Sequence, residues 1–289
     1  MLVDLVDTTT SDNVKLHGIF LEPEKARTGL IVDAVLMVHG SGGNFYASPS
    51  NPRAARLREE SIPVALFNTR SHDVVGGRSG EVKLGNAFET LDDCRMDMLA
   101  AVGWLVERGY PRVAIWGSSL GATKVVYAQA KNQDPNVGAV IALGPLRFSH
   151  AYYSACEMKD LHLKHYEEAK ALVAAGKPNQ LMPVDFPNPN ALFTAAVHLD
   201  RHCSERYDIT KAHADKVTCP FLILTGTEEK HPRMLDAGRD MYELAKGNPG
   251  TKWVHVEGGD HGLHNNDDLL FDELLGWLSG TKAPATVAP

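Results

Sequence analysis

A serine between two closely spaced glycines is the first feature of this chain that could do chemistry. Gly117, Ser119 and Gly121 match the pattern G-x-S-x-G, between an apolar run at 112–116 and a helix-patterned stretch at 122–131. In that context the central serine is held at a sharp turn, with its hydroxyl exposed above the edge of a sheet as a nucleophile. Side chains at either glycine would collide with the neighbouring strand and helix, so the tight turn requires both.

A serine hydroxyl is a weak nucleophile, and it needs a base, a group that orients the base, and donors for an oxyanion. After such a turn the expected chain order is serine, acid, histidine. His261 lies in a Gly-rich loop directly after a strand-like segment at 252–256, and it is the predicted base. His255 lies inside that segment and is expected to pack. His264 is the reserve candidate.

The orienting acid is expected after the preceding strand-like segment, 220–225. Glu229 comes three residues after Gly226, where the strand ends, and it is the predicted acid. Glu228 is its rival, and both could instead be solvated loop charges. Asp260, next to the predicted base, is expected to form a turn.

The loop after a strand-like segment at 34–38 supplies the predicted oxyanion donors. Because glycine lets backbone N–H groups approach a substrate closely, we expect the Ser41 N–H, beside Gly40, to act together with the Leu120 N–H at the start of the helix. His39 is expected to support this loop. Three residues are predicted to line the substrate pocket: Phe45, Tyr46 and Ser118.

The bulk properties of the chain limit its class. A chain of 289 residues with 44% hydrophobic and 22% charged residues can form one large domain, or one domain with an insertion. A net charge of −7 does not indicate binding to nucleic acid or to an anionic membrane, because both require a basic surface. No apolar run approaches the ~20 residues of a membrane span, and no secretion signal is evident. We therefore expect a cytoplasmic protein that acts on a small molecule. The oligomeric state is not indicated.

The four cysteines are scattered without metal-binding spacing, and we expect reduced thiols. Cys203 follows His202, but no partner cluster is visible in the sequence. We therefore predict no metal site, and no organic cofactor is required.

Apolar strand-like segments alternate with helical patterns along the chain, which predicts a mostly parallel α/β sheet flanked by helices. Residues 1–146 and 217–280 are assigned to this core. Residues 147–216 interrupt the alternation before the acid-bearing strand, and they contain helix-like stretches at 152–163, 164–175 and 190–199 around a Pro-rich connector at 178–189. They are predicted to form a helical cap over Ser119 that shapes the pocket. Residues 281–289 are predicted to be a disordered tail.

With these features, the chain resembles the α/β-hydrolase superfamily. The resemblance rests on the loop at 39–43, the turn at 117–121, the acid loop at 226–229 and His261. Finer matches at 43–46, 68–73 and 124–127 resemble an uncharacterised esterase-like branch. The finer resemblance brings no known substrate. From the residues together with the family resemblance, we predict a serine hydrolase that cleaves a carboxylic ester of a small or medium-sized molecule.

Several alternatives stay open. The same residues would support hydrolysis of an amide, a thioester or a carbon–carbon bond, or acyl transfer, and a hydrolase scaffold can also serve as a non-catalytic binding protein. Haloalkane dehalogenase and epoxide hydrolase chemistry are disfavoured, because both use an aspartate where this chain has Ser119. Near the site, Arg70 and Asp73 are expected to form a local ion pair, and Lys124 is expected to be structural.

Overall fold

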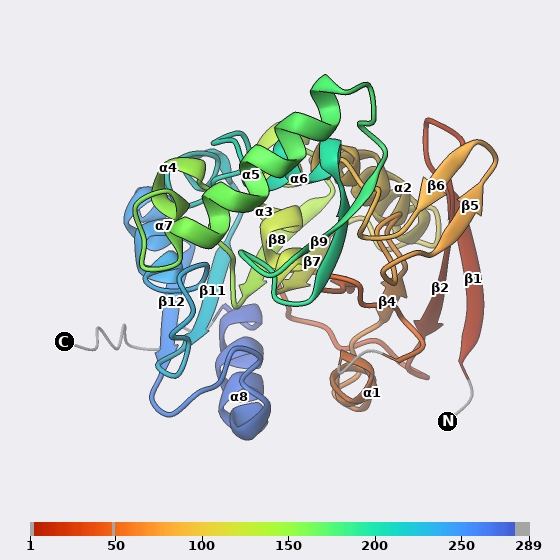
Figure 1. The fold of residues 1–289 in the computed structure, drawn as a ribbon. Helices are drawn as coiled ribbons and strands as arrows, with labels where there is room; N and C mark the ends of the chain where they lie inside the picture. Colours follow the sequence, from red (N-terminus) through yellow and green to blue (C-terminus); the bar gives the residue numbers. More distant parts are fainter. Residues whose placement is uncertain (1–2, 48–49, 281–289) are drawn as a thin grey trace.

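An eight-stranded sheet runs through the centre of the protein (Figure 1). The computed structural model describes residues 3–47 and 50–280. The strands of the sheet are β1 (Asp4–Thr9), β2 (Lys15–Leu21), β3 (Ala34–Val38), β4 (Val64–Phe67), β7 (Val113–Ser118), β8 (Val137–Leu143), β11 (Phe221–Gly226) and β12 (Thr251–Val256). Their order is β1-β2-β4-β3-β7-β8-β11-β12. Only the pairs β1–β2 and β2–β4 are antiparallel and the other pairs are parallel, which confirms the predicted mostly parallel sheet.

Two groups of helices cover the two faces of this sheet. These helices are α1 (Ser50–Glu59), α2 (Cys94–Val106), α3 (Leu120–Asn132), α7 (Ala237–Ala245) and α8 (Asp267–Leu278). In β3, Leu36 and Val38 pack on one face in the cluster that includes α2, α3 and α7, whereas Val35 and Met37 pack on the other with α1 and α8. Because both faces of the inner strands are buried, β3, β4, β7, β8 and β11 read as nearly continuous apolar runs.

Helix α2 begins at Cys94, directly after the short 3₁₀ turn Leu91–Asp93. The residues before it use their backbone groups in tertiary contacts. The Ala87 N–H donates to the Val74 carbonyl at 3.1 Å, and the Ala87 carbonyl accepts from the Thr194 N–H at 3.0 Å. These backbone groups are therefore not available for a helical turn.

Residues between β8 and β11 form the insertion, drawn mainly in green in Figure 1, which packs along one side of the sheet. Its elements are α4 (His150–Tyr153), α5 (Lys159–Ala174), β9 (Leu181–Val184), β10 (Ala191–Thr194) and α6 (Ala195–His202). A second short hairpin, β5 (Gly77–Ser79) and β6 (Val82–Leu84), lies between β4 and α2.

The predicted helical stretch at 190–199 is wrong for residues 191–194, and the Pro-rich connector contains a strand at 181–184. These residues form the antiparallel hairpin β9–β10. Met182, Val184 and Phe193 of the hairpin pack with Ala169 of α5 in a small hydrophobic cluster that is separate from the two sheet clusters. The cap therefore has a small core of its own, to which the hairpin, α5 and α6 all contribute.

Among the described residues, no helix combines the length and apolarity needed to cross a bilayer. The predicted disordered tail, residues 281–289, lies outside the described residues.

Candidate active site

Ser119 lies at the sharp turn between β7 and α3. Its backbone has φ 58° and ψ −121°, a conformation that costs energy for any residue with a side chain. A Cβ added at Gly117 would lie 2.1 Å from the Gly121 carbonyl oxygen, and one added at Gly121 would lie 2.4 Å from the Val38 carbonyl oxygen. Both positions therefore exclude any side chain, as the sequence indicated.

Three side chains from three separate loops meet at this turn. The Nε2 atom of His261 lies 3.0 Å from the Ser119 hydroxyl, and its Nδ1 atom lies 2.8 Å from a carboxylate oxygen of Glu229. Because an ionised carboxylate can only accept, we assign the ring proton to Nδ1, which donates to Glu229. The Nε2 lone pair is then free to accept the Ser119 proton.

Glu229 is the most buried member of this group, with its side chain only 4% exposed. Burial raises the pKa of Glu229, and the hydrogen bond from His261 opposes that rise. In such a dry position the carboxylate interacts strongly with any positive charge that forms on the imidazole ring.

The rival candidates lie elsewhere. Glu228 is exposed and pairs with Lys230 at 2.8 Å. Asp260 pairs with His264 at 2.9 Å, and the His255 ring lies 2.9 Å from the Thr225 hydroxyl. The structure thus brings Glu229 and His261 to Ser119, and it places these other residues in contacts of their own.

The predicted oxyanion loop lies against the serine. A Cβ added at Gly40 would lie 3.1 Å from the Ser119 Cβ, so Gly40 and the Ser41 that follows it adjoin the site. On the other side, the Leu120 N–H lies in the first turn of α3, where a backbone N–H has no acceptor within its own helix.

His39 holds this loop in place. Its Nε2 atom accepts the Thr69 N–H at 3.1 Å, so the ring proton lies on Nδ1, which donates to the Gly40 carbonyl at 2.9 Å. Burial lowers the pKa of His39 to about 3, which keeps the ring neutral. His39 therefore acts as a support for the loop, as the sequence analysis expected.

A buried charge network, which the sequence analysis did not identify, lies beneath the site. Lys124 of α3 lies 2.6 Å from Glu89 and donates to the Thr69 hydroxyl at 3.2 Å and to Ser71. Glu89 also pairs with Arg201 of the cap helix α6 at 3.1 Å. The Lys124 and Glu89 side chains are fully buried. One feature of the sequence could have indicated this network. Lys124 lies among apolar residues of α3, and a buried ammonium requires a buried partner.

Two of the three predicted pocket residues share one hollow. Phe45 and Tyr46 line a hollow of about 300 Å³, together with residues of β2 and of the loop after β4, whose lining includes none of Ser119, His261 or Glu229. The Tyr46 hydroxyl donates to Asp73, and the residue is 57% exposed. Ser118 is half-buried at the end of β7, next to the nucleophile turn.

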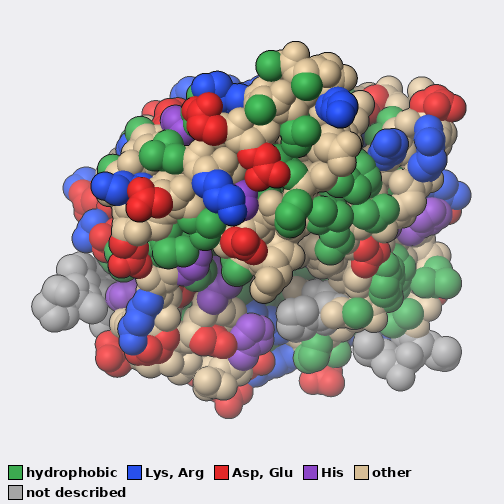
Figure 2. All heavy atoms as spheres, in the orientation of Figure 1, with side chains coloured by type: hydrophobic (Ala, Val, Ile, Leu, Met, Phe, Trp, Pro, Cys, Tyr) green, Lys and Arg blue, Asp and Glu red, His purple; other side chains and the backbone are tan. Residues whose placement is uncertain are grey.

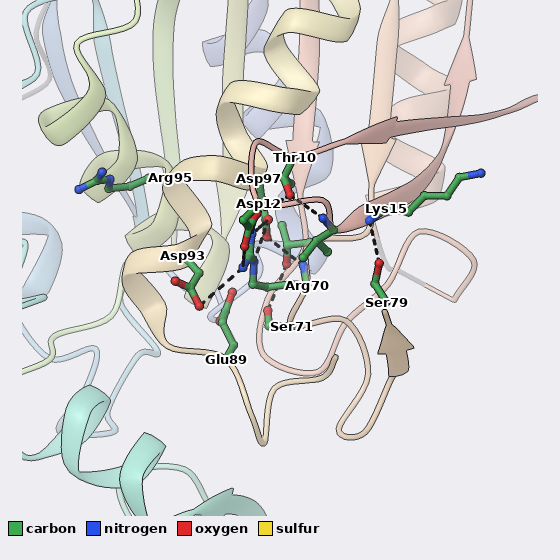
Figure 3. Close-up of polar contacts among 12 residues, drawn as sticks. Thr10, Asp12, Lys15, Arg70, Ser71, Ser79, Glu89, Asp93, Arg95 and Asp97 are labelled. Atoms are coloured by element: carbon green, nitrogen blue, oxygen red, sulfur yellow. Dashed lines mark hydrogen bonds and ion pairs between the residues drawn. The ribbon is translucent and has the colours of Figure 1, made fainter. Parts of the chain in front are cut away.

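The predicted pair between Arg70 and Asp73 is wrong. Arg70 instead contacts three acids from other segments, as Figure 3 shows: Asp12 at 2.9 Å, Asp97 at 2.9 Å and Asp93 at 3.7 Å. Asp73 accepts from Asn44 at 2.7 Å and contacts His72 at 2.8 Å. Arg70 therefore fastens the loop after β4 to helix α2 and to the turn after β1, and it is part of the scaffold.

The cap reaches the site through the acid loop. Phe186 of the cap stacks on His231, with ring centroids 5.6 Å apart, two residues beyond Glu229. Arg233, also on this loop, donates to the Pro187 carbonyl of the cap at 3.2 Å. On the face shown in Figure 2, histidine side chains gather between the cap and α8. The cap therefore contacts the loop that carries Glu229.

Comparison with known proteins agrees with this arrangement. Residues 35–273 match the model of the alpha/beta hydrolase family. The chain belongs to that family. This α/β hydrolase has no significant match among curated protein sequences.

Solved structures show the same fold over nearly the whole hydrolase. The alpha/beta hydrolase GrgF from Penicillium sp. sh18 is 17% identical with a TM-score of 0.73, covering 97% of this chain and 99% of that chain. The esterase Pf2001 from Pyrococcus furiosus is 16% identical with a TM-score of 0.66, covering 98% and 92%. Est1E from Butyrivibrio proteoclasticus, solved with ferulic acid bound, is 16% identical with a TM-score of 0.64, covering 96% and 99%.

Proposed function

We propose that this protein is a serine hydrolase that cleaves a carboxylic ester of a small or medium-sized molecule. The observation that carries the proposal is the chain of contacts from Ser119 through His261 to Glu229, at 3.0 and 2.8 Å. This order of nucleophile, base and orienting acid is what acyl transfer by a serine requires. The esterases among the structural neighbours support an ester as the first substrate class to test.

In the proposed reaction, the Ser119 hydroxyl attacks the ester carbonyl as His261 Nε2 takes its proton. Glu229 holds the ring by its Nδ1–H and stabilises the imidazolium that forms. When the tetrahedral intermediate collapses, the carbon–oxygen bond to the alcohol breaks, and His261 returns the proton to the leaving alkoxide. Water then attacks the acyl-enzyme by the same proton transfers, which releases the acid and restores Ser119.

We assign the oxyanion to the N–H groups of Leu120 and Ser41, with Gly40 giving the substrate room. The loop and the start of α3 flank Ser119, so both donors can reach a negative oxygen bonded to the attacked carbon. Loss of one such donor typically raises the barrier by ~3 kcal/mol. His39, through its hydrogen bond to Gly40, keeps this loop in position.

The test is hydrolysis of p-nitrophenyl esters with acyl chains from acetate to long fatty acids, with Ser119→Ala as the matched variant. We expect turnover in the wild type and its loss in the variant, because alanine fills the same space without a nucleophile. The acyl-chain length of the best substrate would then indicate the size of the pocket that binds the acyl group.

A fluorophosphonate probe separates this proposal from a binding-only role. A serine activated by His261 becomes covalently labelled, and Ser119→Ala does not. Absence of both labelling and ester turnover in well-folded wild type would refute the serine-hydrolase proposal. Labelling without ester turnover would retain the nucleophile and refute the ester substrate.

A further inference from the structure

Five histidines in the cap form an almost continuous array. The ring centroids of His150 and His162 are 5.1 Å apart, those of His165 and His198 are 6.2 Å apart, and those of His198 and His202 are 5.5 Å apart. These residues lie on helices α4, α5 and α6, so no local sequence pattern marks them as neighbours. The proposed ester chemistry does not use any of them.

At one end of the array, two of the histidines meet a cysteine. One ring nitrogen of His150, one of His162 and the Sγ atom of Cys203 all lie within 4.8 Å of one another. The Nδ1 atom of His150 and the Nε2 atom of His162 are 2.9 Å apart, so one ring donates to the lone pair of the other. The sequence analysis found no partner for Cys203, and the fold supplies two.

Neutral imidazole nitrogen and thiolate sulfur are ligands that Zn²⁺ prefers in proteins. In a tetrahedral site with ordinary bond lengths, two ligand atoms lie about 3.3–3.6 Å apart. The two ring nitrogens, 2.9 Å apart, are slightly closer than this range, and no pair of the three atoms is more than 4.8 Å apart. Modest shifts of the half-buried His150 and Cys203 side chains would bring the three atoms to tetrahedral spacing. Three protein ligands would leave the fourth position for water or another donor.

The histidine array also contains nitrogens that the protein leaves without partners. Within the part of the chain that the structure describes, Nδ1 of His162 and both ring nitrogens of His198 and His202 have no hydrogen-bond partner. His162 and His198 are fully buried, and His202 is 1% exposed. Histidines that serve only for packing normally have their buried nitrogens paired. The cap core is therefore rich in unsatisfied donor and acceptor atoms beside the His150–His162–Cys203 cluster.

We propose that His150, His162 and Cys203 form a Zn²⁺ site inside the cap. The ion takes the place of the hydrogen between the two rings, and that proton moves to the other nitrogen of the donating ring. The Cys203 thiol releases its proton to solvent as the sulfur–zinc bond forms, so each Zn²⁺ bound frees one proton. The bound ion ties α4, α5 and the residue after α6 together, and it stabilises the cap over the active site.

The test is a titration of untagged, full-length protein, freed of metal by a chelator, with Co²⁺ and then Zn²⁺. Tetrahedral Co²⁺ bound to a thiolate gives a near-ultraviolet charge-transfer band, which Zn²⁺ abolishes on displacement. We expect saturation at one ion per chain and a rise in Tm with Zn²⁺. Cys203→Ser should remove the band. Loss of an outer-shell partner typically weakens metal binding by roughly 10–100-fold. His150 is a direct ligand in the proposed site, so His150→Ala should weaken binding by at least as much.

Cys219→Ser is the matched control, because Cys219 is another half-buried thiol but lies outside the cap. It should retain the band, and circular dichroism should show all variants folded. The proposal is overturned if the wild type shows no saturable binding of either ion. It is also overturned if the band survives Cys203→Ser, or if Cys219→Ser removes it. None of these measurements depends on ester turnover.

Discussion

Glu229 is buried where its charge is costly, and the imidazolium that would form on His261 is the charge that can offset this cost. The 2.8 Å contact between them is direct, whereas Glu228 faces solvent beside Lys230. Two adjacent glutamates therefore have sharply different environments. A pair of isosteric substitutions can separate their roles.

Glu229→Gln should lower kcat by roughly 10³–10⁴-fold with little change in KM. The amide keeps the shape of the side chain but cannot stabilise the imidazolium, and its N–H₂ group can impose the wrong tautomer on His261. Steady-state kinetics on the best p-nitrophenyl ester would measure the loss. Glu228→Gln should remain near wild type, and equal losses in the two variants would contradict the assignment of Glu229.

The residues of the proposed triad could be predicted because each follows a strand within a few residues and lies beside glycines. The partners of buried charges could not be predicted in this way. Glu89 and Arg201 lie far from Lys124 in the sequence, and nothing local links the three. For the same reason the sequence suggests a pair between Arg70 and its neighbour Asp73, although the three aspartates that Arg70 contacts come from distant segments.

At the scale of elements, the turn between β7 and α3 depends on close backbone packing. In Gly121→Ala, the new Cβ would meet the Val38 carbonyl oxygen at 2.4 Å, which forces β3 and α3 apart. We expect lower stability and a large loss of activity, because Ser119 and the Leu120 N–H move with the turn. Thermal unfolding and ester kinetics would measure the two effects.

Gly103→Ala is the matched control for that substitution. A Cβ at Gly103 in α2 meets nothing within 4 Å, so the change should raise the free energy of unfolding by about 0.5–1 kcal/mol and leave kinetics unchanged. Similar outcomes for the two glycine variants would show that the packing argument is wrong.

The network under the site gives a second prediction about elements. Glu89→Gln leaves the Lys124 and Arg201 charges buried without a carboxylate, and it should lower the free energy of unfolding by about 3–5 kcal/mol. Lys124→Met leaves Glu89 paired with Arg201 and should cost less. It should still reduce kcat, because Lys124 supports Thr69, which in turn supports His39.

Chemical denaturation and ester kinetics would test this ordering, with Lys131→Met as the control at an exposed position of the same helix. A greater loss of stability in Lys124→Met than in Glu89→Gln would reverse the predicted ordering.

At the scale of the whole molecule, the central sheet could be predicted more fully than the cap. The parallel strands are buried on both faces, so their sequences are apolar throughout. The hairpin β9–β10 lies partly in a Pro-rich segment, and its apolar side chains pack with residues of both α5 and α6. These contacts form only in the folded cap, so no local pattern reveals the hairpin.

Buried histidines couple the stability of the whole molecule to pH. Burial lowers the pKa of both His39, in the core, and His198, in the cap, to about 3. A histidine in the unfolded chain titrates near 6.5, so the unfolded state takes up these protons first as the pH falls. The stabilisation from each neutral ring is therefore complete above about pH 6.5 and is lost progressively toward pH 3.

We expect the free energy of unfolding to fall below pH 6.5, with each of these histidines contributing up to about 1.4 kcal/mol per pH unit. Urea denaturation between pH 7 and pH 4.5 would measure the slope. The glutamine in His198→Gln cannot take up a proton. The free energy of unfolding of this variant should therefore depend less steeply on pH, by the contribution of one histidine. Leu5→Gln, which introduces glutamine at an exposed position of β1 without removing a titratable group, should retain the wild-type slope. If His198→Gln also retained that slope, His198 would not be a buried neutral ring in the folded protein.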